Sequence, residues 1–149
     1  KEGVLCLGNI YKCDKCDICD DPIFPVVWKN NKFRIVEIND PSYSAYYRVE
    51  YIEHVKEMTD LDENDRMELM KVVFTVETAI KNFYKPDKIN LASLGNLTPH
   101  IHWHVIPRFK TDNHYPESIW SAQKKFKKTN ISTQTKNKIN QFISKNLCK

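Results

Sequence analysis

The chain has no apolar run that approaches the length of about 20 residues that a membrane-spanning helix needs. No secretory signal pattern stands at its start, and no internal repeat is visible. Its net charge of +4 is small, which suits ligands that carry phosphate but does not by itself call for nucleic acid. These absences predict a soluble protein that has neither a membrane nor a nucleic acid as its partner.

The cysteines do not suggest a disulfide framework either. The chain has 5 of them, an odd number, and Cys16 and Cys19 form a Cys-x-x-Cys pair. Such a pattern favours free thiols or metal ligands in a reducing compartment, so we expect a cytoplasmic protein. Because the chain begins at Lys1 rather than at Met, we expect its first residues to be missing or processed.

The hydrophobic pattern predicts an α+β fold, and 149 residues are enough for one domain with a real core. Asp62 is the expected N-cap of one long amphipathic helix, over residues 62–84, which ends before Pro86. About five antiparallel strands are expected to form the sheet on which this helix packs, at residues 26–28, 33–38, 46–52, 89–94 and 100–108.

Three regions follow from the composition along the chain. Residues 1–15 form an N-terminal arm, residues 16–120 the main domain, and residues 121–149 a Lys- and Asn-rich peripheral helix or partly disordered tail. Four apolar residues of the last region recur at helical spacing: Ile139, Phe142, Ile143 and Leu147. The run from Lys124 to Lys128 is interpreted as a solvated helix face rather than as a nucleic-acid site.

Three histidines alternate with apolar residues in the last predicted strand: His100, His102 and His104. Because side chains of a strand alternate between its faces, the three imidazoles are expected on one face. A single histidine, such as His114, is adequately explained as a structural residue, but three in register would each need buried partners. A shared metal is the other simple explanation. The outer two would lie about 13 Å apart along an extended strand, however, so all three cannot bind one zinc.

His-x-His-x-His followed by two apolar residues resembles the signature of the histidine triad (HIT) family of nucleotide hydrolases and transferases. The resemblance covers most of residues 16–120. It includes the Cys-x-x-Cys pair, His54-Val55 before the long helix, residues 87–104, and the loop with residues 112–116 and 119–120. The last two segments are similar to a bacterial subgroup of the family. The resemblance implies a HIT-like fold.

The resemblance also implies a mechanism. His102 would attack the α-phosphorus of a nucleotide and form a nucleotidyl-histidine that water then hydrolyses. His104 would donate a hydrogen bond to phosphate oxygens or to the leaving atom, and His100 would orient its neighbour or hold the scaffold. The implied substrates are dinucleoside polyphosphates, nucleoside phosphoramidates and other nucleoside monophosphate conjugates.

Candidate substrate contacts come from the same resemblance: Asn90, the backbone N–H groups near Gly95 and Asn96, and, more remotely, Ile38 and Asn39. The loop before the histidines is one residue shorter than the commonest HIT pattern, and Leu97 stands where a phosphate-binding serine is frequent. Arg108 is a further phosphate-binding candidate, although an arginine after a strand end is usually only solvated.

Some HIT-like proteins are similar in binding a structural zinc ion, which catalysis does not require. Mapped onto this chain, the ligands are Cys16, Cys19, His54 and His100. Cys13 is an alternative ligand, since Cys13-x-x-Cys16 has the same spacing. The competing interpretation is that the two cysteines are reduced thiols and that His54 bonds to His100.

The sequence thus predicts a HIT-fold nucleotide hydrolase or nucleotidyl transferase that acts at a nucleoside α-phosphate. The alternative is a non-catalytic nucleotide-binding or zinc-stabilised interaction module. The resemblance further implies a homodimer.

Overall fold

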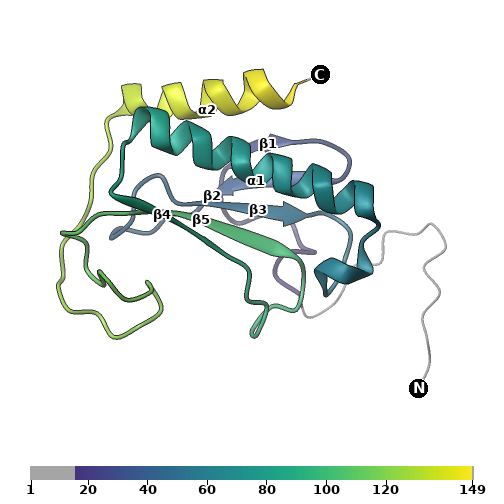
Figure 1. Cartoon of the computed structure of the whole chain (residues 1–149), viewed down its shortest axis with the longest axis horizontal. Helices are drawn as coiled ribbons and strands as arrows, with labels where there is room; N and C mark the ends of the chain where they lie inside the picture. The colour runs from purple at the N-terminus through teal and green to yellow at the C-terminus, as the bar shows by residue number, and fades with distance from the viewer. Residues whose placement is uncertain (1–15, 149) are drawn as a thin grey trace.

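The computed structural model describes residues 16–148, which form one five-stranded antiparallel sheet covered by two helices (Figure 1). Along the sheet the strands lie in the order β1-β2-β3-β5-β4. Their bounds are β1 Val26–Lys29, β2 Phe33–Glu37, β3 Tyr47–Tyr51, β4 Lys88–Ala92 and β5 His102–Arg108. The histidine strand β5 is therefore an interior strand, paired on one side with β3 and on the other with β4. This confirms the expected α+β architecture.

Two helices lie on one side of this sheet (Figure 1). A short 3-10 helix, η1 Met58–Asp60, precedes α1 Glu63–Phe83, and the Asp62 side chain accepts a hydrogen bond from the N–H of Asp65 as the N-cap. The last helix, α2 Thr133–Leu147, runs beside α1 and also contacts β1. No helix among residues 16–148 is both long and apolar enough to cross a membrane.

The main core lies between the sheet and the two helices. Ile35, Val49 and Val105 supply fully buried side chains from three neighbouring strands, and α1 and α2 pack against them. Ile139 and Ile143 are fully buried, so the C-terminal segment contributes a helix to the core rather than lying at the periphery. The predicted boundaries at residues 16 and 121 remain predictions, and the arm of residues 1–15 lies outside the described residues.

Two local expectations are wrong. β5 begins at His102, so His100 does not belong to the strand. The reason is that β3 ends at Tyr51 and the chain turns away towards His54. The N–H of Ile101 donates to the carbonyl of Val55 at 2.8 Å, outside the ladder.

The run from Lys124 to Lys128 is exposed as expected, but it forms no helix face. The N–H groups of Lys124 and Lys127 donate to the backbone carbonyl and side-chain oxygen of Asn113, both at 2.9 Å. These bonds hold the segment in an extended form along the loop that follows β5, and they compete with helical hydrogen bonds.

Candidate active site and metal centre

His102 and His104 lie on the sheet face that the helices do not cover. They are two residues apart on β5, so their side chains share a face, and their ring centroids lie 5.0 Å apart with the planes nearly perpendicular. Both are buried, at 7% and 9% exposure. Burial is the main reason why the pKa of each imidazole is lowered, to about 3 for His104. The pair is therefore neutral near pH 7.

A backbone carbonyl sets the tautomer of His102. Its Nδ1 lies 2.6 Å from the carbonyl oxygen of His100, and because a carbonyl only accepts, Nδ1 must carry the proton and donate it. In a neutral ring the other nitrogen, Nε2, then holds a free lone pair. The local fold therefore presents His102 as a nucleophile or base through Nε2.

His104 is held by two aromatic neighbours. Its Nδ1 lies 2.6 Å from the hydroxyl of Tyr46, and the indole of Trp120 meets the ring edge-on with centroids 5.0 Å apart. When the tyrosine hydroxyl donates to Nδ1, the proton of His104 sits on Nε2, from which it can be donated to a bound group. Trp120 is itself 49% exposed and so borders open space beside the histidines.

Charged side chains from β2 and β3 share the same face. Arg48 lies directly opposite His104 and Glu50 opposite His102 in the pairing of β3 with β5. The carboxylate of Glu50 is fully buried and accepts hydrogen bonds from the guanidinium groups of both Arg34 and Arg48. A cluster of two partly exposed cations and one buried anion therefore lies beside the two histidines.

The interpretation of Arg108 as a solvated residue is wrong, because its side chain is 2% exposed. Nε and Nη2 donate to the carboxylate of Asp112 at 2.7 and 3.1 Å, and Nη1 donates to the Oδ1 of Asn90 at 2.7 Å. A fourth hydrogen bond, from Nη2 to the carbonyl of Glu117 at 2.7 Å, holds the loop segment that leads to Trp120. Arg108 thus fixes β4 and this loop to β5.

The structure places the predicted substrate contacts in different parts of the molecule. Asn90 lines a cavity of about 460 Å³ at the β4 edge together with Glu77 of α1 and Trp120, but neither of the two strand histidines lines it. The Oδ1 of Asn90 accepts from Arg108. Ile38 packs against Tyr46 and is half-buried. The other predicted contacts do not join this cavity wall: Gly95, Asn96 and Asn39.

Gly95 and Asn96 lie in the loop between β4 and His100. Gly95 has a φ of 74°, a left-handed conformation that glycine adopts without strain, and it turns the chain back towards Pro99. Asn96 is exposed, as are Asn39 and Leu97, so their side chains are open to solvent.

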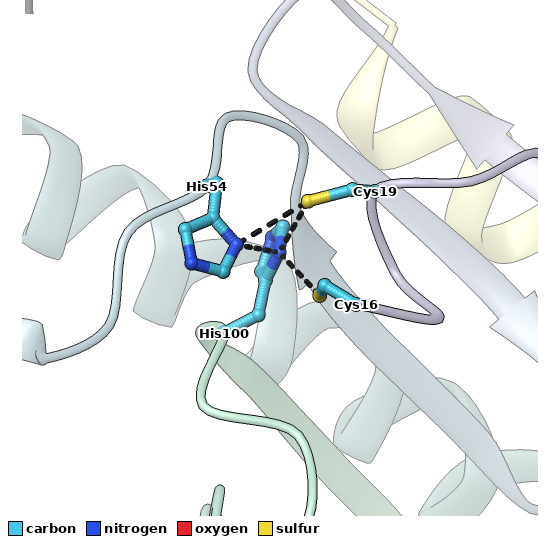
Figure 2. A group of neighbouring side chains, drawn as sticks. All are labelled: Cys16, Cys19, His54 and His100. Carbon is cyan, nitrogen blue, oxygen red and sulfur yellow. Dashed lines mark hydrogen bonds between the residues drawn. The ribbon is translucent and has the colours of Figure 1, made fainter. Parts of the chain in front are cut away.

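His100 belongs to a second cluster, which it forms with Cys16, Cys19 and His54 (Figure 2). The Nδ1 of His100 lies 3.3 Å from the Sγ of Cys16, 3.4 Å from that of Cys19 and 3.2 Å from the Nδ1 of His54. All four donor atoms lie within 4.8 Å of one another, and the group could hold a metal ion. The four residues that the resemblance names are brought together. Cys13 lies outside the described residues.

The chemistry of the donor set fits a metal. The Nε2 of His100 lies 2.5 Å from the carbonyl oxygen of Tyr51 and must donate to it, which leaves the Nδ1 lone pair facing the two sulfurs. Bonds of about 2.0–2.3 Å to a tetrahedral ion place its ligand atoms about 3.3–3.8 Å apart. The observed N–N and N–S separations of 3.2–3.4 Å are close to that range.

Sequence reasoning did not single out Tyr46, Arg48 or Glu50 as residues of the site. The alternation of two charged residues with the buried Tyr47 and Val49 signals that the other face of this strand is polar. Which strand lies beside the histidines is a long-range feature, however, and the sequence pattern does not contain it.

Three comparisons place this chain among known proteins. The sequence pattern of the HIT domain matches residues 25–111. A bis(5'-adenosyl)-triphosphatase from Saccharomyces cerevisiae is 34% identical over 64 residues, in a match that covers 40% of this chain and 31% of that protein. The match thus spans less than a third of the length of this curated relative.

Solved structures share the fold. A histidine triad protein from Bradyrhizobium japonicum has a TM-score of 0.67 at 24% identity and covers 82% of this chain and 89% of its own. A histidine triad (HIT) protein from Sinorhizobium meliloti gives 0.65 at 22% identity, covering 82% and 88%. Because the HIT domain pattern covers more than half of the residues and the fold agrees, this chain belongs to the HIT family.

Proposed function

We propose that this protein is a nucleotide hydrolase or nucleotidyl transferase that cleaves at a nucleoside α-phosphate through a covalent intermediate on His102. The observation that carries the proposal is the hydrogen bond from the Nδ1 of His102 to the carbonyl of His100, which leaves the Nε2 lone pair free. The partial match to a bis(5'-adenosyl)-triphosphatase supports dinucleoside polyphosphates as substrates. Nucleoside phosphoramidates and other nucleoside monophosphate conjugates contain the same reacting phosphorus.

The reaction would take place as two displacements. In the first, the Nε2 lone pair of His102 bonds to the α-phosphorus, and the bond from phosphorus to the leaving group breaks with its electron pair. His104, neutral and bonded to Tyr46, donates the Nε2 proton to the leaving atom or to a phosphate oxygen. In the second, water bonds to the phosphorus and gives a proton to the Nε2 of His104, the N–P bond breaks, and the Nε2 of His102 recovers its lone pair.

The substitution H102A distinguishes this proposal from the alternative of a non-catalytic nucleotide-binding module. Purified protein and variant are assayed on bis(5'-adenosyl) triphosphate, an adenosine phosphoramidate and an adenylyl ester, with AMP affinity measured by calorimetry. We expect turnover by the unaltered protein and a loss of about 10⁴-fold or more in H102A with AMP binding retained. No turnover on any of these substrates by the unaltered protein would instead favour the binding module.

We further propose that Cys16, Cys19, His54 and His100 hold a structural zinc ion. The mutual distances of the four donor atoms and the orientation of His100 support it, and the ion would fasten the N-terminal loop to the start of β5. Metal analysis should find about one zinc per chain, and much less in C16S. The variant C148S is the matched control, because Cys148 is an exposed free thiol far along the chain. Metal-free wild-type protein would favour the competing interpretation, reduced thiols with His54 bonded to His100.

We also propose a cellular compartment and an oligomeric state for this protein. Thiol ligands at this site suit a reducing compartment, so we propose a cytoplasmic protein. We also propose a homodimer, because the family resemblance implies one. β4 is an edge strand of the sheet and offers a place where two copies could pair symmetrically. Light scattering at several concentrations measures the mass, and a monomer at all of them would overturn the dimer.

A further inference from the structure

We infer that Arg48 is a substrate-binding residue, whose guanidinium binds an anionic oxygen of the nucleotide beside the phosphorus that His102 attacks. The inference rests on the proposed function, which it deepens by naming the residue that makes the site selective for a charged phosphate.

Arg48 lies close to both histidines. Arg48 on β3 is the direct cross-strand partner of His104 on β5, and His102 is the next residue along β5 on the same face. Directly opposed Cβ atoms in an antiparallel pair lie about 4.5–5.5 Å apart, and diagonal ones remain within reach of a long side chain. An arginine at this place can therefore reach a group bound to either histidine.

The net charge beside the histidines also favours an anion there. Arg34 and Arg48 both pair with the buried Glu50, so this cluster of three residues carries one more positive than negative charge. The neighbouring imidazoles add no negative charge, because His102 and His104 are neutral or cationic. Within the described part of the chain, this excess cation lies where the proposed reaction places a phosphate anion.

The two arginines differ in their other hydrogen-bond partners. Arg34 is turned towards the loop that carries Cys16 and Cys19: its Nη2 donates to the carbonyl of Ile18 at 2.5 Å and its Nη1 to that of Asp20 at 3.5 Å. The described polar partner of Arg48 is Glu50, reached through Nε and Nη2, both at 2.6 Å. A guanidinium has five N–H donors, and the Arg48 side chain is 20% exposed, so it can offer further donors to a ligand.

A purely structural role explains less. One buried carboxylate is balanced by one guanidinium, and Arg34 already provides it at 12% exposure. Desolvating a second guanidinium is unfavourable unless it gains a counter-charge. The planar fork of arginine matches two phosphate oxygens, so a phosphate is the counter-charge that suits this site chemically. The ring of Phe24, 5.7 Å from the Cζ of Arg48, helps to hold the guanidinium in place.

Calorimetry with AMP and with adenosine tests the inference without requiring turnover. In R48Q we expect AMP affinity to fall about 10- to 100-fold, because hydrogen bonds to a charged phosphate are lost. Adenosine affinity should stay within about twofold, since it lacks the anion. The variant R48K keeps the charge and should recover part of the AMP affinity.

R34Q is the matched control, because it breaks the other ion pair of the same carboxylate. It should change AMP affinity less than R48Q, with folding of each variant followed by thermal unfolding. If R48Q binds AMP as the unaltered protein does, or loses AMP and adenosine equally, the inference is overturned while the proposed function stands. If the unaltered protein binds no AMP, the proposed function itself fails, and this inference with it.

Discussion

At the scale of single residues, the hydrogen-bond partner of each imidazole decides what that histidine can do. The carbonyl of His100 turns the lone pair of His102 towards the open face, and the carbonyl of Tyr51 turns that of His100 towards two sulfurs. The hydroxyl of Tyr46 contacts the Nδ1 of His104 in a different way: when it donates there, His104 carries its proton on Nε2. Three identical side chains in one short segment thus have three different hydrogen-bonding arrangements, which their neighbours set.

The first prediction concerns Tyr46. Removing its hydroxyl in Y46F takes away the hydrogen-bond partner of the His104 Nδ1, so the tautomer of His104 is no longer fixed. We therefore expect kcat/KM to fall up to about tenfold, as for the loss of one neutral hydrogen bond. Y47F is the matched control, because Tyr47 is a buried tyrosine on the opposite face that donates to the Oδ1 of Asn140. Steady-state kinetics of both variants decide the point. Equal losses in Y46F and Y47F would mean that the effect is one of stability alone.

Much of this residue chemistry is visible in the sequence. The alternation around His102 and His104 predicts their shared face, and the family resemblance brings Cys16 and His54 into one cluster with His100. The hydrogen-bond partners are not predictable in this way. They depend on strand pairing between residues far apart in the sequence, such as Tyr46 and His104.

At the scale of elements, the loop after β5 is organised by one buried ion pair. Asp112 accepts from Arg108 and also from the N–H groups of His114 and Tyr115, at 2.9 and 2.7 Å. Burial alone would raise the pKa of this carboxyl, but these hydrogen bonds outweigh it and lower the pKa to about 2. The same loop carries Trp120 to His104, so its order matters for the candidate active site.

The second prediction is the pH dependence of this pair. Because the folded pKa of about 2 lies below the unfolded value of 3.8, Asp112 stabilises the fold above pH about 4 and loses this effect as the pH falls towards 2. D112N should therefore lower the free energy of unfolding by about 3 kcal/mol at pH 7. The difference in this free energy between D112N and the unaltered protein should become smaller in acid. Urea unfolding measured at pH 7, 4 and 3 tests this.

D87N is its control, since Asp87 is an exposed carboxylate that accepts from the N–H of Lys110. It should change stability by only about 0.5 kcal/mol. A D112N protein as stable as the control, or a difference that grows in acid, contradicts the account.

Element boundaries show where sequence patterns succeed. The N-cap Asp62 and the stop before Pro86 locate α1 to within a residue or so, because these signals are local. The run from Lys124 to Lys128 shows the opposite, since Asn113 imposes an extended backbone on it from a distance. The burial of Arg108 likewise depends in part on Asn90, which lies 18 residues away on β4.

At the scale of the whole molecule, α2 completes the core. It packs on α1 and contacts β1, and Ile139 and Ile143 share one hydrophobic cluster with the sheet. The opposite face of the sheet carries His102 and His104, and it is contacted by loops such as the one with Trp120. One face of the sheet therefore provides stability, and the other provides the candidate chemistry.

The third prediction is that the C-terminal helix unfolds together with the domain. I143A creates a cavity at a fully buried position and should lower the free energy of unfolding by about 2–5 kcal/mol in a single cooperative transition. I23A, at a side chain that is 87% exposed, should have almost no effect. A separate early transition for α2, or no difference between the two variants, would show that the helix is not part of the core.

The central claim is that His102 becomes bonded to the α-phosphorus during the reaction. The most direct test is the stereochemical course at that phosphorus, followed with a substrate whose α-phosphate is made chiral by isotopes and sulfur. Each in-line displacement inverts the configuration, so two displacements through a nucleotidyl-histidine predict overall retention. Overall inversion would mean that water attacks the phosphorus directly, and it would contradict the role of His102 as the nucleophile.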